Sequence, residues 1–135
     1  MALSAETKQN LIEAARQARK WAYAPYSKFY VGAALLTASG KVYDGVNIES
    51  VAYPTTICAE RVAVFKAVSE GERQFEAIAV VTSNGGMPCG ACRQVLAEFG
   101  LDTLVISANA DGQLLQEMTL SELLPGAFTP KDLLP

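Results

Sequence analysis

Residues 77–107, AIAVVTSNGGMPCGACRQVLAEFGLDTLVIS, contain the pattern that decides the fold. The runs at 77–82 and 104–107 are short and apolar, which is typical of buried strands. Between them, apolar residues at helical spacing and a closing glycine predict a helix over 89–99. Because this helix lies between two buried strands, the stretch indicates an α/β fold.

The same alternation of helices and strands extends to both ends of the chain. We expect a helix capped by Ser4 and ended by Pro25, strands at 30–37 and 41–46, a helix capped by Thr55 or Thr56 and running to Ser69, a strand at 113–118, and a short last helix with a Thr119–Glu122 capping box. This order predicts a single domain over residues 1–135, a three-layer α/β/α fold with a mixed five-stranded sheet. The periodicity also places Trp21 on the apolar face of the first helix and Val62, Phe65 and Val68 on that of the second. The order of the strands in the sheet does not follow from these patterns.

The composition limits the partners that the chain can have. Half of the residues are hydrophobic, 19% are charged and the formal net charge is −3. Because nucleic-acid binding needs a basic surface, this charge argues against a nucleic-acid polymer as partner and leaves small neutral ligands open. Since no apolar run approaches the roughly 18 residues of a membrane span and no signal peptide is recognisable, we expect a cytoplasmic protein that does not enter membranes.

Three cysteines indicate a metal site. Cys89 and Cys92 form a C-x-x-C pair at a predicted helix start, and residues three apart share one face of a helix. Cys58 lies near the start of another predicted helix, and helix N-termini favour thiolates. The chain has no histidine, so the usual fourth ligand of a structural zinc site is missing. Because catalytic zinc sites keep one position open, three thiolates favour a catalytic metal.

Two charged residues follow Cys58 within one helical turn. Glu60 can approach a water molecule at the metal without ligating the metal, which is the position that a proton shuttle needs. Arg61 can donate to the sulfurs and offset the net −1 charge of three thiolates and Zn²⁺.

Several alternatives remain open at this point. Free cysteines are often small buried hydrophobic residues, and a Glu-Arg pair is often a solvated helix face. Cys89 and Cys92 could also serve a thiol-disulfide oxidoreductase, and the three cysteines could belong to a structural zinc module that binds partners.

Two motifs resemble the zinc-binding boxes of the cytidine deaminases. They are Cys58-Ala59-Glu60-Arg61 and the run PCGACRQ at 88–94, which match the general signature of zinc deaminases except that cysteine replaces the first histidine ligand. This replacement is similar to the small, homotetrameric type of the family. The resemblance continues at 24–29 (APYSKF), 31–35 (VGAAL), 45–49 (GVNIE) and 122–128 (ELLPGAF), and thus spans nearly the whole chain.

The resemblance implies a specific reaction. It implies one Zn²⁺ per chain and hydrolytic deamination of cytidine and 2′-deoxycytidine to uridine and 2′-deoxyuridine with release of ammonia, in pyrimidine salvage. Glu60 would act first as base and then as acid. A related deaminase for another cytosine nucleoside, such as blasticidin S, is an alternative because such enzymes share the zinc boxes.

The resemblance also assigns the substrate-binding residues. It implies that Asn47 and Glu49 bind the ribose hydroxyls, which agrees with the rule that residues i and i+2 of an extended segment point the same way. It places Phe29 near the base, includes Ala59 in the substrate site, and implies that Phe128 reaches the site of a neighbouring subunit in a homotetramer.

Overall fold

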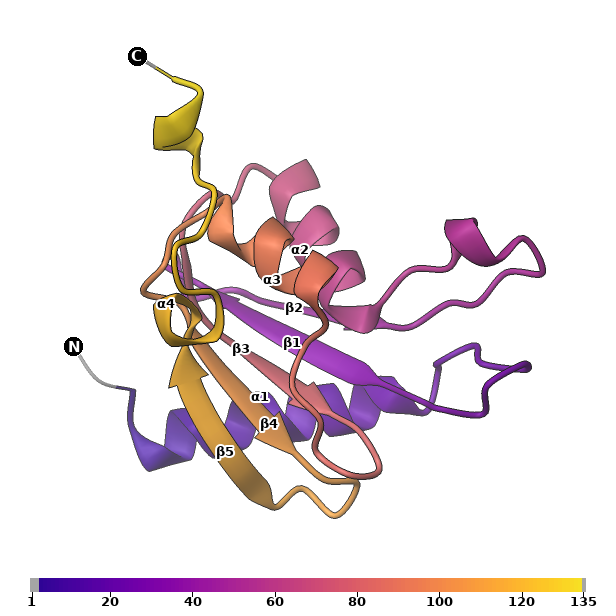
Figure 1. The fold of residues 1–135 in the computed structure, drawn as a ribbon. Coiled ribbons are helices and arrows are strands. Elements are labelled where there is room, and N and C mark those ends of the chain that lie inside the picture. Colours follow the sequence, from indigo (N-terminus) through magenta and orange to yellow (C-terminus); the bar gives the residue numbers. More distant parts are fainter. Residues whose placement is uncertain (1–2, 135) are drawn as a thin grey trace.

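The computed structural model describes residues 3–134 and contains one five-stranded sheet with helices on both faces (Figure 1). The predicted order of elements is confirmed. The elements are α1 (Ala5–Arg19), β1 (Gly32–Thr37), β2 (Val42–Val46), the 3₁₀ turn η1 (Tyr53–Thr55), α2 (Ala59–Ser69), β3 (Phe75–Val81), α3 (Gly90–Ala97), β4 (Leu104–Ala108), β5 (Leu114–Thr119), α4 (Leu120–Leu123) and the 3₁₀ turn η2 (Pro130–Asp132).

The sheet is mixed, as the sequence predicts. Its strand order is β2-β1-β3-β4-β5, with β3 and β4 parallel and the other neighbouring pairs antiparallel. The parallel pair is connected through α3, so β3, α3 and β4 form the crossover unit that residues 77–107 indicate. The loop after β3 therefore leads directly into the helix that carries the C-x-x-C pair.

The two faces of the sheet have separate cores. Helix α1 packs on one face, where Ile12 and Ala15 meet alternate residues of the central strands. Helices α2 and α3 cover the other face, where Val64 and Leu96 pack against the residues in between. Because the central strands are buried on both faces, they are apolar almost throughout, which explains why they are so clear in the sequence.

Two glycines allow the helices to approach the sheet closely. A Cβ atom on Gly32 would collide with the Ala15 carbonyl of α1. A Cβ atom on Gly45 would lie 2.5 Å from the Ala59 carbonyl oxygen at the start of α2. Gly45 therefore lets the first turn of α2 sit against β2, and this turn carries residues of the candidate site.

The first helix is shorter than predicted. It ends at Arg19 rather than just before Pro25, and Trp21 is 76% exposed instead of lying on the buried face. The chain leaves the helix because the Tyr23 backbone N–H donates to the Asn47 carbonyl and Tyr23 pairs with Ile48. This pairing redirects the segment after α1 toward the site.

The second helix starts later than predicted and buries a different face. Its N-cap is Cys58, whereas Thr55 and Thr56 belong to η1 and its C-cap. Phe65 is 49% exposed, while the buried positions are mostly alanines. Helix α2 lies so close to the sheet that small residues fit beneath it, and Val62, Phe65 and Val68 are displaced to its flanks.

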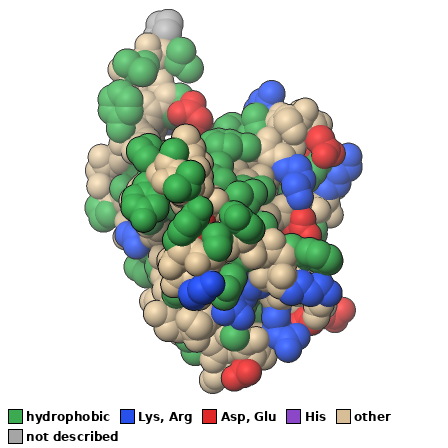
Figure 2. Space-filling model, turned by 90° about the vertical axis from the view of Figure 1, so that its right-hand side faces the viewer, with side chains coloured by type: hydrophobic (Ala, Val, Ile, Leu, Met, Phe, Trp, Pro, Cys, Tyr) green, Lys and Arg blue, Asp and Glu red, His purple; other side chains and the backbone are tan. Residues whose placement is uncertain are grey.

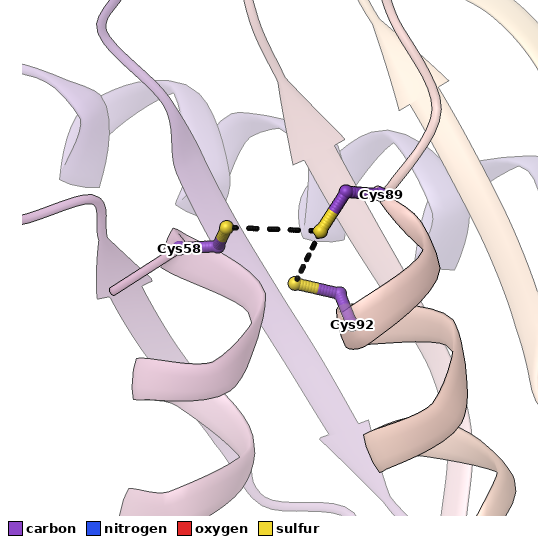
Figure 3. Close-up of side chains that lie close together, drawn as sticks. All are labelled: Cys58, Cys89 and Cys92. Atoms are coloured by element: carbon purple, nitrogen blue, oxygen red, sulfur yellow. Dashed lines mark hydrogen bonds between the residues drawn. The ribbon is translucent and has the colours of Figure 1, made fainter. Parts of the chain in front are cut away.

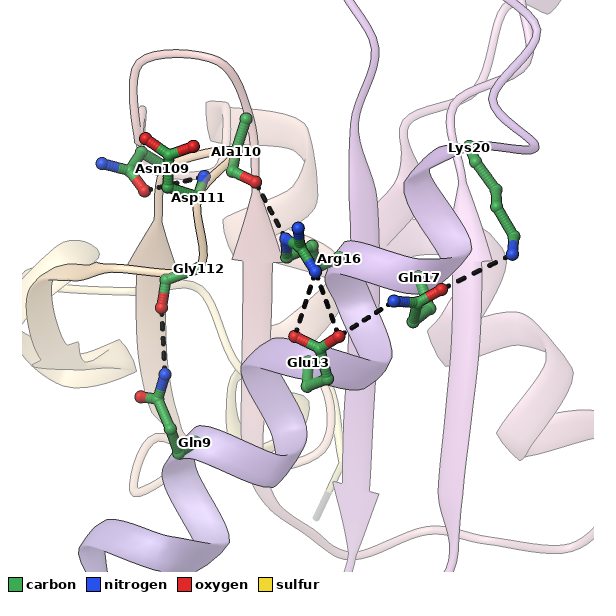
Figure 4. A network of polar contacts seen from close by, with 9 residues as sticks. All are labelled: Gln9, Glu13, Arg16, Gln17, Lys20, Asn109, Ala110, Asp111 and Gly112. Atoms are coloured by element: carbon green, nitrogen blue, oxygen red, sulfur yellow. Dashed lines mark hydrogen bonds and ion pairs between the residues drawn. The ribbon is translucent and has the colours of Figure 1, made fainter.

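A polar network joins α1 to the turn between β4 and β5 (Figure 4). The Gln9 side chain donates to the Gly112 carbonyl, and the Arg16 guanidinium donates to the Ala110 carbonyl, both at 3.0 Å.

No helix within residues 3–134 has both the length and the apolar character needed to cross a membrane.

Candidate functional site

The three cysteines meet between the N-termini of α2 and α3 (Figure 3). Cys58 and Cys89 are the N-caps of these helices, and Cys92 lies in the first turns of α3. The Sγ atoms of Cys58 and Cys89 are 3.9 Å apart, and those of Cys89 and Cys92 are 3.6 Å apart. All three cysteines are free thiols.

This geometry fits a single zinc ion. Tetrahedral zinc with Zn–S bonds of about 2.3 Å requires sulfurs about 3.8 Å apart, and the three Sγ atoms all lie within 4.8 Å of one another. Among residues 3–134, no further histidine, cysteine or carboxylate joins this group. The donor set is therefore that of a zinc site with a position left for a non-protein ligand.

The surroundings favour a thiolate at Cys58. The Arg61 guanidinium donates to the Cys58 Sγ at 3.4 Å. Hydrogen bonding by Cys92, followed by that of Arg61, lowers the pKa of Cys58 to about 5. The same contact with Cys58, together with burial, raises the pKa of Cys92. The opposite directions of the two pKa shifts show that Cys58 and Cys92 share one hydrogen bond, and a bound cation would take the place of its proton.

Glu60 is a buried carboxyl group beside this cluster. It is 5% exposed, and burial raises the pKa of Glu60 to about 7. A group with such a pKa can accept and release a proton near neutral pH. Glu60 belongs to the first turn of α2, and Gly45 allows this turn to sit against the sheet.

A cavity of about 340 Å³ opens from the cluster. It is lined by Cys58, Cys89 and Glu60 and also by three residues that the resemblance assigns to the substrate: Phe29, Asn47 and Glu49. Thr56 and Ile57 also line it, and they belong to segment 50–57, which the resemblance places near the base. Among the described residues that line it, sequence reasoning missed Ser27, Val31, Val80, Thr82, Gly86 and Met87. Ser27 and Val31 lie in the quoted blocks 24–29 and 31–35, and that proximity is the one signal that could have found them.

Two of the residues predicted to bind the substrate do not line this cavity in the described chain. Ala59 is fully buried under α2. Phe128 is 55% exposed on the C-terminal segment, where its carbonyl accepts a hydrogen bond from Gln94.

Asn47 and Glu49 hold one wall of the cavity in place. The Asn47 amide accepts from the Val31 N–H at 2.9 Å and donates to the Phe29 carbonyl at 2.8 Å. The Glu49 carboxylate accepts from the Ser27 hydroxyl and from the N–H groups of Tyr26 and Ser27. The Ser27 hydroxyl hydrogen bond is the main cause that lowers the pKa of Glu49. Both side chains therefore position the segment that carries Phe29.

The comparisons with known proteins agree with this geometry. The family model described as "Cytidine and deoxycytidylate deaminase zinc-binding region" matches residues 5–108. A cytidine deaminase from Halalkalibacterium halodurans is 57% identical over 129 residues, which cover 93% of this chain and 97% of the relative. A cytidine deaminase from Sporosarcina psychrophila is 53% identical over 128 residues, covering 93% of each chain.

A solved structure confirms the fold class. The crystal structure of cytidine deaminase from Burkholderia pseudomallei superposes with a TM-score of 0.84 at 46% sequence identity, covering 93% of this chain and 100% of that chain. The zinc-box motifs, the convergence of their cysteines and these matches lead to one conclusion: the chain belongs to the cytidine and deoxycytidylate deaminase family.

Proposed function

We propose that this chain is a cytidine deaminase that converts cytidine and 2′-deoxycytidine, with water, to uridine and 2′-deoxyuridine and ammonia. Residues 1–135 would form one catalytic domain that holds one Zn²⁺ through Cys58, Cys89 and Cys92. The observation that carries this proposal is the opening of the three-sulfur cluster into a cavity that also contains the buried carboxyl group of Glu60.

Glu60 is the proposed proton carrier. When bound, zinc would supply a Lewis acid that makes a water molecule nucleophilic near neutral pH. Glu60 accepts a proton from the attacking water and passes it to N3 of the cytosine ring. After water has added to C4, Glu60 takes the proton of the new C4 hydroxyl and delivers it to the 4-amino group; the C4 carbonyl forms as the C–N bond breaks and ammonia leaves. One carboxyl group can serve both steps because the pKa of Glu60 is raised to about 7.

Arg61 supports the same site through the sulfurs. Three thiolates and Zn²⁺ carry a net charge of −1, which would weaken the metal as a Lewis acid. The hydrogen bond from Arg61 to the Cys58 Sγ withdraws negative charge from that sulfur.

The cavity wall suits a nucleoside. Its volume of about 340 Å³ lies within the range of small-molecule sites. Phe29 offers an aromatic surface to the base. The Asn47 amide keeps one N–H and one lone pair after its two backbone bonds, and Glu49 keeps acceptor capacity for ribose hydroxyls. By family resemblance, Ala59 would contribute through its main chain, because its side chain is buried.

We extend the proposal to a cytoplasmic homotetramer that acts in pyrimidine salvage. The site requires three reduced thiols, a state that the cytoplasm maintains.

Hydrophobic side chains gather on the outer face seen in Figure 2. Phe65 and Phe128 are both exposed, and Phe65 borders a groove with Val95 and Phe99. Burial of such surface between copies would bring Phe128 near a neighbour's cavity. Light scattering tests the assembly; a fully active species at the 14.4 kDa monomer mass contradicts it.

The direct test is incubation with cytidine while the base absorbance is followed, with and without a zinc chelator. The proposal predicts ammonia and uridine in equal amounts and loss of turnover after chelation. Dithiol activity without deamination would instead support the oxidoreductase alternative for Cys89 and Cys92. A panel that includes blasticidin S then tests the substrate, since Thr56 and Ile57 of segment 50–57 line the cavity and could shift the preference.

A further inference from the structure

Arg93 connects two parts of the chain that the catalytic proposal leaves unrelated. Its Nε donates to the Pro88 carbonyl at 2.8 Å, and its Nη1 donates to the Leu123 carbonyl at 2.9 Å. Pro88 directly precedes Cys89, and Leu123 is the last residue of α4. The guanidinium thus links the backbone that enters the metal site to the start of the C-terminal segment 123–128. Figure 1 shows α4 and the following chain beside α3.

Both hydrogen bonds are of a strong type. The donor is charged, the geometry is that of a planar fork, and each acceptor is a main-chain carbonyl. Arg93 itself is half-buried and Pro88 is buried, so water competes poorly for these carbonyls. The next residue, Gln94, donates to the Phe128 carbonyl at 2.8 Å and holds the far end of the same segment.

We propose that Arg93 is a positioning residue. It couples docking of the C-terminal segment 123–128 to the rigidity of the backbone that carries the three-cysteine site. Loss of the Arg93 fork leaves the Pro88 carbonyl without this hydrogen bond, and the backbone at Cys89 then becomes more mobile. Release of the segment at Leu123 frees one arm of the fork and has the same effect in weaker form. The inference rests on the proposed function only for its zinc site, and its tests do not require turnover.

The chain offers a matched control in Arg73. Its Nη1 also donates to two main-chain carbonyls, those of Val68 and Glu72, at 2.8 and 2.9 Å. These carbonyls lie at the C-terminal end of α2, whereas Cys58 caps the N-terminal end of this 11-residue helix, about 16 Å away. Arg73→Lys therefore removes an exposed guanidinium that holds two main-chain carbonyls through one nitrogen, without touching the site.

The first test measures how fast the zinc-loaded protein releases zinc to a chromogenic chelator. Arg93→Lys keeps the charge but cannot form the fork, and it should release zinc about 10- to 100-fold faster than the parent, the usual effect of losing a support of a metal ligand. Arg73→Lys should release zinc at the parent rate. Equal rates in Arg93→Lys and Arg73→Lys would overturn the proposal.

The second test uses the parent protein and so does not depend on a variant that folds. Because coupling is reciprocal, removal of zinc should speed amide hydrogen exchange in 124–128 and leave exchange at 70–73 unchanged. Unchanged exchange in 124–128 would overturn the coupling. If the chain held no zinc, the proposed function would fail separately. Faster alkylation of Cys89 in metal-free Arg93→Lys than in Arg73→Lys would then still support the positioning role, and equal alkylation would refute it.

Discussion

The two faces of the sheet are built from similar elements but differ in what they bury. On the α1 face, the cluster around Ile12 and Ala15 is entirely hydrophobic, and the bonds from Gln9 and Arg16 to the 109–112 turn close its border (Figure 4). On the α2/α3 face, the core continues into a cavity lined by a carboxyl group and by two of the three clustered cysteines. Figure 3 shows this cysteine cluster.

The difference lies in how the helices meet the sheet. Helix α1 runs along its face and contributes side chains from its middle. Helices α2 and α3 direct their N-termini at a common point, where free backbone N–H groups and the positive ends of the helices favour anionic sulfur. The α1 face thus supplies stability and the other face supplies chemistry, a separation that substitutions can test.

The largest effect should come from the cysteines. Replacement of Cys58, Cys89 or Cys92 by Ala should remove zinc and deaminase activity together, because two sulfurs cannot complete the site. Elemental analysis of freshly reduced protein measures the metal. Ser107→Ala is the control: this fully buried hydroxyl on the same face has no hydrogen-bond partner among residues 3–134, so its loss should change neither readout. Full zinc content in all three cysteine variants would refute the metal assignment.

Glu60 should give the next largest effect. Glu60→Gln keeps the shape of the side chain and removes proton transfer, so we expect at least about a 10²-fold fall in kcat with zinc retained. Steady-state kinetics together with zinc analysis separate this result from loss of metal. Glu76→Gln, at an exposed position of β3, serves as the control. Turnover near the parent value in Glu60→Gln would exclude Glu60 from the mechanism.

Local patterns predicted the elements on both faces, because a strand or helix that packs against a core must show its period in the sequence. The cysteine cluster was equally accessible, since Cys58, Cys89 and Cys92 each lie within the first turns of a predicted helix. The order of the strands was not accessible, because pairings such as β1 with β3 join segments that lie about 40 residues apart and leave no local signal.

Besides the early end of α1, the errors concern α2 and the cavity wall. The buried face of α2 consists of small residues because Gly45 brings the helix close to β2, a tertiary fact that the valine and phenylalanine spacing obscured. Thr82 and Met87 line the cavity from the loop after β3. Loop residues carry no period, so their place in the site depends on contacts distant in sequence.

A core substitution on the α1 face should separate stability from chemistry. Ile12→Ala removes a side chain that is 0% exposed and should lower the free energy of unfolding by about 2–5 kcal/mol. Denaturant unfolding measures this loss, and Val42→Ala on the exposed edge strand is the control. The folded fraction should keep its zinc and its kcat. A large fall in kcat per folded molecule would show that the two faces are not independent.

The smallest effect should come from the border of the α1 face. Gln9→Ala removes the hydrogen bond to the Gly112 carbonyl, and the turn around this buried glycine loses its tie to α1. Because the bond is neutral and only partly buried, we expect a loss of about 0.5–1.5 kcal/mol in unfolding free energy. Gln17→Ala is the matched control on the same helix: its amide donates to the exposed Glu13 carboxylate and accepts from the Lys20 ammonium, and loss of these local contacts should cost about 0.2–0.5 kcal/mol. Neither variant should alter KM, kcat or the rate of zinc release, because α1 and the cysteine cluster lie on opposite faces of the sheet. A change in zinc release in Gln9→Ala, without one in Gln17→Ala, would mean that the 109–112 turn communicates with the site through β4.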